Sequence, residues 1–268
     1  MFLGHKTDLQ FKESKPIEVL DNKKILINDN GVYKIGSNVC PHQNSRIITT
    51  KTLDIRCQYH GWSWNIDGTP AGAGSTSLCN NIKLHLKDAY EYKGLVFEDK
   101  LDLSVLDHID FGNLVLDEFR IDKINADPRI VMDIFLDVDH IPVVHEGVYN
   151  LLGIEGNAKV TWDYTDWGNV QTVRNGDNKI IALWIAVYPY TMIEWQDGFL
   201  FVTRCIDETK IAVWRYRDPS RPEQEYIENK NMFETAFSQD KYQAEQMVRF
   251  PSAHLEEAKE HYREWLDK

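Results

Sequence analysis

Two short segments of the chain each contain one cysteine and one histidine. The first, "NVCPHQ", holds Cys40 and His42, and the second, "CQYHGW", holds Cys57 and His60. Four cysteines in 268 residues are too few for a disulfide framework, and in a reducing compartment paired Cys and His residues are more often metal ligands. Two thiolates and two imidazoles suit either zinc or an iron–sulfur cluster.

The spacing of these residues separates the two metals. Zinc fingers usually pair like with like, because each short loop wraps one tetrahedral ion. Here each arm carries one Cys and one His, which favours a two-iron cluster with both thiolates on one iron and both imidazoles on the other. The segments "CPH" and "CQYHGW" resemble the Rieske [2Fe-2S] motif. We therefore expect residues 1–102 to form a β-rich Rieske domain that holds one such cluster.

A second group of candidate ligands lies in "DIFLDVDHIPVVHEG", where Asp137, His140 and His145 follow the pattern D-x2-H-x4-H. Asp137 and His140 are neighbours on one face of a predicted helix. On an unbroken helix His145 would be turned by about 500° from His140, so the chain must bend between them. Pro142 is the expected cause of the bend. Alone, two histidines and an aspartate are more often surface or core polar residues without a metal.

A third candidate ligand lies in a predicted helix over 223–249. An apolar stripe runs from Phe233 to Met247 on this helix, and Asp240 falls in its middle. A buried acid is costly unless it is paired or bound to a cation. A helix cap or an ion pair is the alternative role for Asp240. Glu245 lies off the stripe and is expected to be solvated.

D-x2-H-x4-H after a Rieske motif resembles the mononuclear-iron motif of Rieske non-haem iron oxygenases, the ring-hydroxylating oxygenase alpha-subunit family. This resemblance implies that His140, His145 and Asp240 hold one Fe(II) as a 2-His-1-carboxylate triad. It implies that Asp137 is a catalytic bridging aspartate. It also implies a homotrimer in which His60 of one chain hydrogen-bonds Asp137 of the next. The chain would be a short member of the family.

By that resemblance, the protein is expected to be a Rieske-type mono- or dioxygenase. It would use dioxygen, with electrons from a separate NAD(P)H-dependent reductase or ferredoxin, to hydroxylate, dihydroxylate or oxidatively demethylate a small organic molecule. No G-x-G-x-x-G follows a strand, so a nicotinamide or flavin site within the chain is not expected. Two alternatives stay open: a Rieske-type electron-transfer protein with a non-catalytic C-terminal docking domain, and a zinc-stabilised binding protein.

The elements expected around these residues give an α+β chain with two domains, 1–102 and 103–268. Asp127-Pro128 is typical of a helix start, and residues 159–216 alternate as strands of an antiparallel sheet. Helices are expected over 223–249 and after Pro251. The second domain should therefore be a catalytic mononuclear-iron domain with a sheet packed against helices, in a helix-grip-like arrangement.

A substrate pocket is expected between this sheet and the iron helices. An apolar, aromatic-lined pocket would suit an aromatic or alicyclic molecule. Strand alternation lets only some of the candidates face inward. The candidate lining residues are Leu151, Leu152, Trp184, Tyr188, Met192, Trp195 and Phe201.

Composition limits the remaining classes of function. Acidic residues outnumber basic ones by 42 to 30, a formal net charge of −12, which disfavours a nucleic-acid surface. No stretch approaches the roughly 20 apolar residues of a membrane span, and the first ten residues lack the apolar core of a signal peptide. A cytoplasmic protein with no nucleic-acid or membrane partner is expected.

Overall fold

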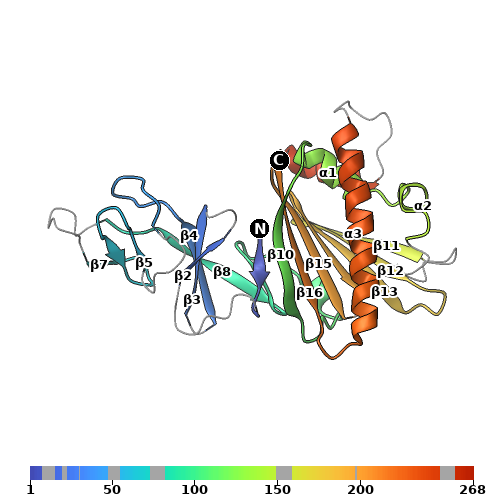
Figure 1. Ribbon diagram of the computed structural model, residues 1–268, viewed down its shortest axis with the longest axis horizontal. Coiled ribbons are helices and arrows are strands. Elements are labelled where there is room, and N and C mark those ends of the chain that lie inside the picture. The colour runs from blue at the N-terminus through green and yellow to red at the C-terminus, as the bar shows by residue number, and fades with distance from the viewer. Residues whose placement is uncertain are drawn as a thin grey trace. The chain divides into compact units, whose positions relative to one another are not determined.

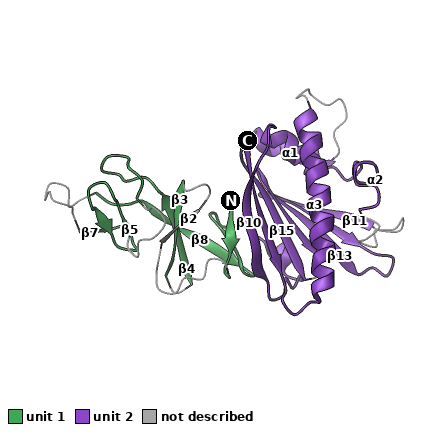
Figure 2. Cartoon of the chain, viewed as in Figure 1, with its two compact units in different colours: residues 1–101 green, residues 102–268 purple. Residues whose placement is uncertain are grey.

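The computed structural model describes residues 1–7, 16–19, 23–29, 31–47, 55–72, 82–148, 159–196, 198–247 and 257–268. The chain forms two compact units, Met1–Leu101 and Asp102–Lys268 (Figure 2). Each unit is described by itself. No helix among the described residues combines the length and the apolarity needed to cross a membrane.

Unit 1 is built from short antiparallel strands. In the described residues they form a six-stranded sheet in the order β1-β9-β8-β4-β3-β2 and a three-stranded sheet in the order β5-β6-β7. The strands are β1 (Phe2–His5), β2 (Pro16–Val19), β3 (Lys24–Asp29), β4 (Val32–Ser37), β5 (Ile55–Arg56), β6 (Ser63–Trp64), β7 (Pro70–Gly72), β8 (Leu86–Tyr92) and β9 (Leu95–Phe97).

A tight turn at Asp67-Gly68 joins β6 to β7 close to the second Cys/His segment. Asp67 Oδ1 accepts a 2.8 Å hydrogen bond from the N–H of Thr69. Gly68 has a φ of +81°, and a Cβ at this position would lie 2.1 Å from the carbonyl oxygen of Leu84. Only glycine fits this approach, so the turn fixes the chain beside the small sheet.

Unit 2 contains one antiparallel sheet, seven-stranded in the described residues, in the order β10-β16-β15-β14-β13-β12-β11. The strands are β10 (Val115–Lys123), β11 (Lys159–Thr165), β12 (Gly168–Arg174), β13 (Ile180–Val187), β14 (Thr191–Gln196), β15 (Phe199–Asp207) and β16 (Lys210–Arg217). The helices are the 3-10 helix η2 (Ser104–Leu106), α1 (Pro128–Phe135), α2 (Ile141–Val144), α3 (Glu223–Gln246) and α4 (Glu257–Leu266). The predicted α+β class, with a sheet packed against helices, is confirmed.

Helix α3 crosses one face of this sheet (Figure 1). Its aromatic residues are stacked on the strand beneath: the rings of Phe201 and Phe233 lie 4.3 Å apart and nearly parallel, and those of Phe233 and Phe237 lie 5.8 Å apart. All three side chains are buried, together with residues of α1, β15 and β16. Burial of each such ring stabilises the packing by about 2–3 kcal/mol.

A network of charged residues also holds α3 against the sheet. Arg215, on β16, is 1% exposed. Its guanidinium donates to Asp117 and Glu118 on β10 and, at 2.6 Å, to Glu234 on α3. Arg120 donates a second, bidentate pair of 2.8 Å bonds to Glu234. Two strands and the helix therefore share one set of charge-assisted hydrogen bonds.

Replacement of Arg215 by methionine should lower the free energy of unfolding by about 3 kcal/mol, because it leaves three carboxylates short of their buried partner. The value is placed at the low end of the usual range since the carboxylate side chains are 23% to 36% exposed. Denaturant unfolding of Arg215→Met and the parent protein measures it.

The control is Arg217→Met on the same strand. Arg217 pairs with Glu223, whose side chain is 66% exposed, and an exposed pair contributes about 1 kcal/mol or less. Equal losses for the two variants would contradict a special role for Arg215.

Candidate metal centres

The two Cys/His segments of unit 1 form loops with the same backbone hydrogen bonds. In each loop the cysteine N–H donates to the carbonyl of the fifth residue after it, and the cysteine carbonyl accepts from the N–H of the fourth. These bonds are Cys40 N to Ser45 O at 2.7 Å, Asn44 N to Cys40 O at 2.8 Å, Cys57 N to Trp62 O at 2.7 Å and Gly61 N to Cys57 O at 2.9 Å. In both loops the fourth residue has a positive φ, 56° at Asn44 and 73° at Gly61. The paired motifs therefore encode two copies of one turn.

The two loops place their cysteines inward and their histidines outward. Cys40 and Cys57 are unpaired thiols and each is 1% exposed. The imidazole rings of His42 and His60 lie 5.1 Å apart, and His42 is stacked on the buried Trp62. His60 is exposed at the surface of the unit. The donor set that the sequence predicts, two sulfurs and two imidazoles, is thus brought together.

The surroundings of this set fit an iron–sulfur cluster. Burial raises the pKa of the Cys40 thiol, whereas the backbone N–H groups of His42 and Gln43 favour its ionised form. His42 Nδ1 is buried without a hydrogen-bond partner in the described part of the chain. Among the described residues, the donor atoms of His140, His145 and Asp240 all lie within 4.8 Å of one another. The donor atoms of Cys40, His42, Cys57 and His60 do not converge as closely. A single tetrahedral ion would require such convergence, so the spacing favours a larger group.

The second group of candidate ligands is positioned by a break between α1 and α2. Helix α1 begins as predicted. The side chain of Asp127 accepts a hydrogen bond from the N–H of Arg129, and Pro128 occupies the first turn. The predicted helix with Asp137 and His140 on one face is wrong, because α1 ends at Phe135. Asp137 Oδ1 accepts the N–H groups of Asp139 at 2.9 Å and His140 at 3.2 Å, and this turn starts α2.

The predicted bend between His140 and His145 is wrong, because α2 runs unbroken between them and the chain bends before His140. Pro142 lies in the first turn of α2, where a missing N–H costs nothing. His140 is the N-cap residue and His145 the C-cap residue of this four-residue helix. The five-residue spacing of the histidines is thus the length of one short helix with its two caps.

Helix α3 supplies the third side chain. Phe233, Phe237 and Ala244 are buried, as the predicted stripe requires, and the side chain of Asp240 is 14% exposed. Met247 departs from the prediction, because the helix ends at Gln246 and Met247 is 53% exposed. Glu245 is exposed and accepts from the N–H of Asn125.

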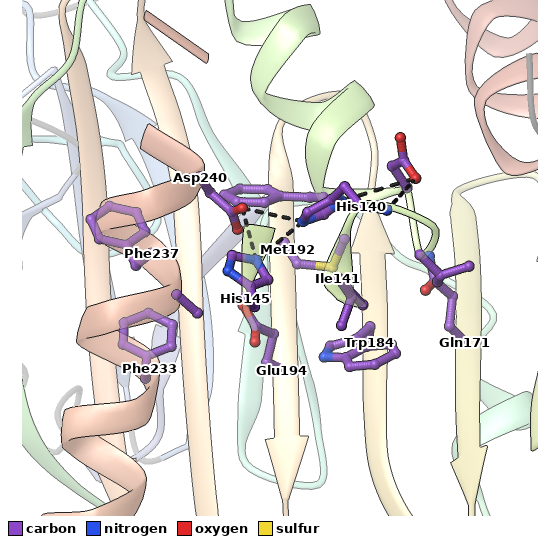
Figure 3. A pocket seen from close by; sticks show the side chains of 14 residues that line it. His140, Ile141, His145, Gln171, Trp184, Met192, Glu194, Phe233, Phe237 and Asp240 are labelled. Atoms are coloured by element: carbon purple, nitrogen blue, oxygen red, sulfur yellow. Dashed lines mark hydrogen bonds and ion pairs between the residues drawn. The ribbon is translucent and has the colours of Figure 1, made fainter. Parts of the chain in front are cut away.

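His140, His145 and Asp240 converge on one point (Figure 3). The two Nε2 atoms lie 3.1 Å apart. Asp240 Oδ1 lies 3.3 Å from His140 Nε2 and 3.0 Å from His145 Nε2. Although these are ion-pair distances, Asp240 Oδ1 has no hydrogen-bond geometry to any partner in the described residues.

These three distances fit a metal ion. Neighbouring ligands at right angles, each about 2.1 Å from a first-row ion, would lie about 3.0 Å apart. Three such positions on one face are the arrangement of a 2-His-1-carboxylate triad. The residues present therefore fit the ion that the sequence predicts.

The charges at this point favour a cation. Burial raises the pKa of Asp240, but the neighbouring His140 and His145 rings outweigh it and hold the pKa below its usual value. Burial lowers the pKa of His145, but the Asp240 carboxylate and the Gln239 amide outweigh it and raise that pKa. His145 Nδ1–H donates to Gln239 Oε1 at 2.8 Å. Gln239, which the sequence reasoning missed, thereby orients the ring.

Asp137 lies beside this group and is engaged by another helix. Its Oδ2 accepts a 2.6 Å hydrogen bond from Lys259 Nζ on α4. Its Oδ1 lies 4.0 Å from His140 Nδ1, an atom that is buried without a hydrogen-bond partner in the described chain. The aspartate thus contacts the turn that carries His140, while its link to His60 of a neighbouring chain stays a prediction.

The triad opens into a cavity between α1, α2, α3 and the sheet. Of the predicted pocket residues, Trp184 and Met192 line it. Tyr188 lies beyond the end of β13, in a cluster with Tyr262, and Phe201 is covered by Phe233. Leu151 and Leu152 lie outside the described residues.

The prediction for Trp195 is wrong because successive residues of a strand face opposite sides of the sheet. Met192 and Glu194 line the cavity, so Trp195, the residue after Glu194, faces the other side of the sheet, where it contacts Phe111. The remaining lining residues are Phe135, Asp137, Val138, His140, Ile141, His145, Gln171, Glu194, Phe233, Ala236, Phe237 and Asp240.

Glu194 is the lining residue that the sequence reasoning missed. Burial raises its pKa to about 8, and the negative charge of Asp240 acts in the same direction. The signal in the sequence was an acid in the middle of the otherwise uncharged strand "TMIEWQ". On a strand an acid with buried neighbours on both sides faces either solvent or a site.

The chain is similar to several known proteins. Residues 1–81 match the family model of the Rieske [2Fe-2S] domain. The putrescine 2-hydroxylase of Ralstonia nicotianae is 24% identical over 217 residues, which cover 68% of this chain and 58% of that protein. The putrescine 2-hydroxylase of Bordetella bronchiseptica is 23% identical over 201 residues, 65% of this chain and 45% of that protein. The chain thus spans about half the length of these curated relatives.

Two solved structures share the fold over nearly the whole chain. A quaternary ammonium Rieske monooxygenase, described for carnitine oxidation by gut microbiota and for inter-subunit electron transfer, is 16% identical with a TM-score of 0.66. The match covers 91% of this chain and 77% of that one. NdmA of Pseudomonas putida CBB5, solved with caffeine, is 16% identical with a TM-score of 0.66, covering 99% and 88%.

The domain match supports a [2Fe-2S] cluster in unit 1 and speaks against the zinc-protein alternative. The relatives and the shared fold extend the likeness beyond that domain. The chain therefore contains a Rieske [2Fe-2S] domain, and it is similar to the two putrescine 2-hydroxylases in sequence and to Rieske monooxygenases in fold.

Proposed function

We infer that this protein is an oxygenase component that hydroxylates, dihydroxylates or oxidatively demethylates a small organic molecule with dioxygen. The observation that carries this inference is the triad of His140, His145 and Asp240, whose donor atoms lie 3.0 to 3.3 Å apart in a chain that also has a Rieske domain. An electron carrier alone needs no such triad. The similar proteins named for putrescine, carnitine and caffeine support a small nitrogen-containing substrate.

Each residue of the triad has a definite task in this proposal. When bound, a ferrous ion with three protein ligands supplies open positions for dioxygen, and the cluster supplies electrons one at a time. His140, His145 and Asp240 hold the ion. Gln239 keeps the proton of His145 on Nδ1, so that Nε2 offers its lone pair to the metal.

The cavity walls position the substrate and keep water out. Phe233 and Phe237 from α3 and Trp184 from β13 present apolar surfaces next to the triad (Figure 3). Apolar walls exclude competing water from the reacting atoms. Gln171 adds a neutral polar group that can donate to and accept from a substrate.

Electrons would come from a separate NAD(P)H-dependent reductase or ferredoxin. We propose a homotrimer in which the cluster of one chain serves the iron of the next, through His60 and Asp137. The inter-subunit electron transfer described for the solved quaternary ammonium monooxygenase supports this proposal. The exposed position of His60 also supports it. A cytoplasmic location remains a prediction from the sequence.

Iron counting tests the proposed triad. The anaerobically purified protein should contain three irons and two acid-labile sulfides per chain. Asp240→Asn should contain two irons and two sulfides, because it removes the charged ligand and leaves the cluster in place. Iron and sulfide analysis, together with the visible spectrum of the cluster, measures both.

Asp139→Asn is the matched control, since Asp139 lies next to the triad in sequence and is not among the residues that line the cavity. It should keep three irons. A parent protein with two irons would favour the alternative of an electron-transfer protein with a docking domain.

A second test concerns Asp137. In Asp137→Asn the amide oxygen can still accept the N–H groups of Asp139 and His140, so the turn should persist and iron should be retained. Loss of the negative charge should lower single-turnover product formation by about 100-fold. Product masses from a chemically reduced sample, screened with N-methyl compounds, methyl ethers and aromatic acids, report the turnover.

Lys259→Met separates the two contacts of Asp137. It removes the ion pair to α4 but keeps the carboxylate, so product formation should stay within about threefold of the parent protein. An equal loss in both variants would show that Asp137 only anchors α4, and would contradict its role as a bridge.

A further inference from the structure

Glu194 lies on the wall of the cavity, close to the triad. It is directly paired with Trp184 in the register of β13 and β14, so both side chains face the same side of the sheet. Both line the cavity together with His145 (Figure 3). A substrate next to the metal would therefore contact the Glu194 carboxyl group.

The other two carboxylates around the cavity have partners in the described residues. Asp240 faces the two histidines at 3.0 and 3.3 Å, and Asp137 pairs with Lys259 at 2.6 Å. Among the described residues, Glu194 has no hydrogen-bond or ion-pair partner. The fourteen described lining residues include no lysine or arginine. Glu194 is therefore the one acid of the cavity wall that the described chain leaves unpaired.

A buried carboxyl group without a partner is unfavourable, and a neutral apolar ligand would seal it from water. The charged form of this carboxyl group lacks solvation on the cavity wall. A cationic ligand would restore this solvation with an ion pair. An aromatic or alicyclic hydrocarbon, as expected from the sequence, would not.

The aromatic walls suit a cation as well. Trp184, Phe135, Phe233 and Phe237 line the same cavity. The face of an aromatic ring attracts ammonium groups, with tryptophan giving the strongest contact, and a set of rings with one acid is a general means of binding alkylated nitrogen. Acid and rings thus favour the same ligand chemistry.

We propose that Glu194 binds a positively charged nitrogen of the substrate, so that the enzyme acts on small aliphatic amines or ammonium compounds. This inference rests on the proposed function for the reaction itself. It adds the substrate class and assigns the residue that selects it.

Matched ligands that differ only in charge test the proposal. The first pair is choline, a cation, and 3,3-dimethyl-1-butanol, a neutral molecule of the same shape. The second pair is 1,4-diaminobutane, a cation, and the neutral 1,4-butanediol, which has a chain of the same length. Calorimetry on the anaerobic holoprotein should show at least about tenfold tighter binding of the charged member in at least one pair. In Glu194→Gln, which keeps the shape of the side chain, that preference should fall below about threefold while binding of the neutral member changes little.

Glu208→Gln is the control, because Glu208 is an exposed acid outside the cavity lining. It should keep the preference. Iron content and melting temperature are measured on the same samples, so that loss of the metal or of the fold is seen separately. Iron loss in the parent protein would count against the proposed function alone.

Three binding results would overturn the role of Glu194. They are equal or tighter binding of the neutral members, no binding of either cation to the parent protein, and an unchanged preference for charge in Glu194→Gln. Iron loss in Glu194→Gln would also overturn it, because the residue would then act on the metal.

Discussion

The close approach of two imidazoles and a carboxylate is the constraint on which unit 2 depends. Three polar atoms held 3.0 to 3.3 Å apart inside a protein are costly unless a positive charge joins them. His140 and His145 come from the two ends of α2, and Asp240 comes from α3. Two segments far apart in the chain must therefore keep a fixed distance, and the sheet provides the common base for both.

Helix α3 connects the metal site to the charge network of the sheet. Glu234, bound by Arg120 and Arg215, lies six residues before Asp240, a distance of about 9 Å along the helix. Phe237, between them, is packed against the stack on β15. The carboxylate that faces the metal is thus placed by contacts that never touch the metal. A side chain held on a rigid element loses less entropy when it binds a ligand.

Much of this arrangement could be predicted from the sequence because it depends on local patterns. The matched Cys/His segments indicated the first centre, and an acid within an apolar stripe indicated Asp240. The end of α1 could not be predicted in the same way. Asp137 takes up the backbone N–H groups of Asp139 and His140, and such side-chain bonds compete with helix continuation. Their geometry, rather than the presence of proline, decides where the helix stops.

The cavity wall was harder to predict than the ligands. Trp184 and Trp195 look alike in sequence, but the strand register puts them on opposite faces of the sheet. Period-two alternation gives the relative orientation of neighbours, and only the packed helices show which face is inner. The sequence therefore marked Glu194 as an unusual residue, but it did not predict that its side chain lines the cavity.

The short helix α2 has a consequence for how this region can vary. Loops near active sites generally tolerate insertions and deletions. Here the four residues Ile141–Val144 separate two ligand candidates, and each added or removed residue would rotate one ring by about 100° relative to the other. Substitutions at the exposed Val143, which is 78% accessible, leave that angle intact. Homologous chains should thus differ here in side chains while keeping one invariant length.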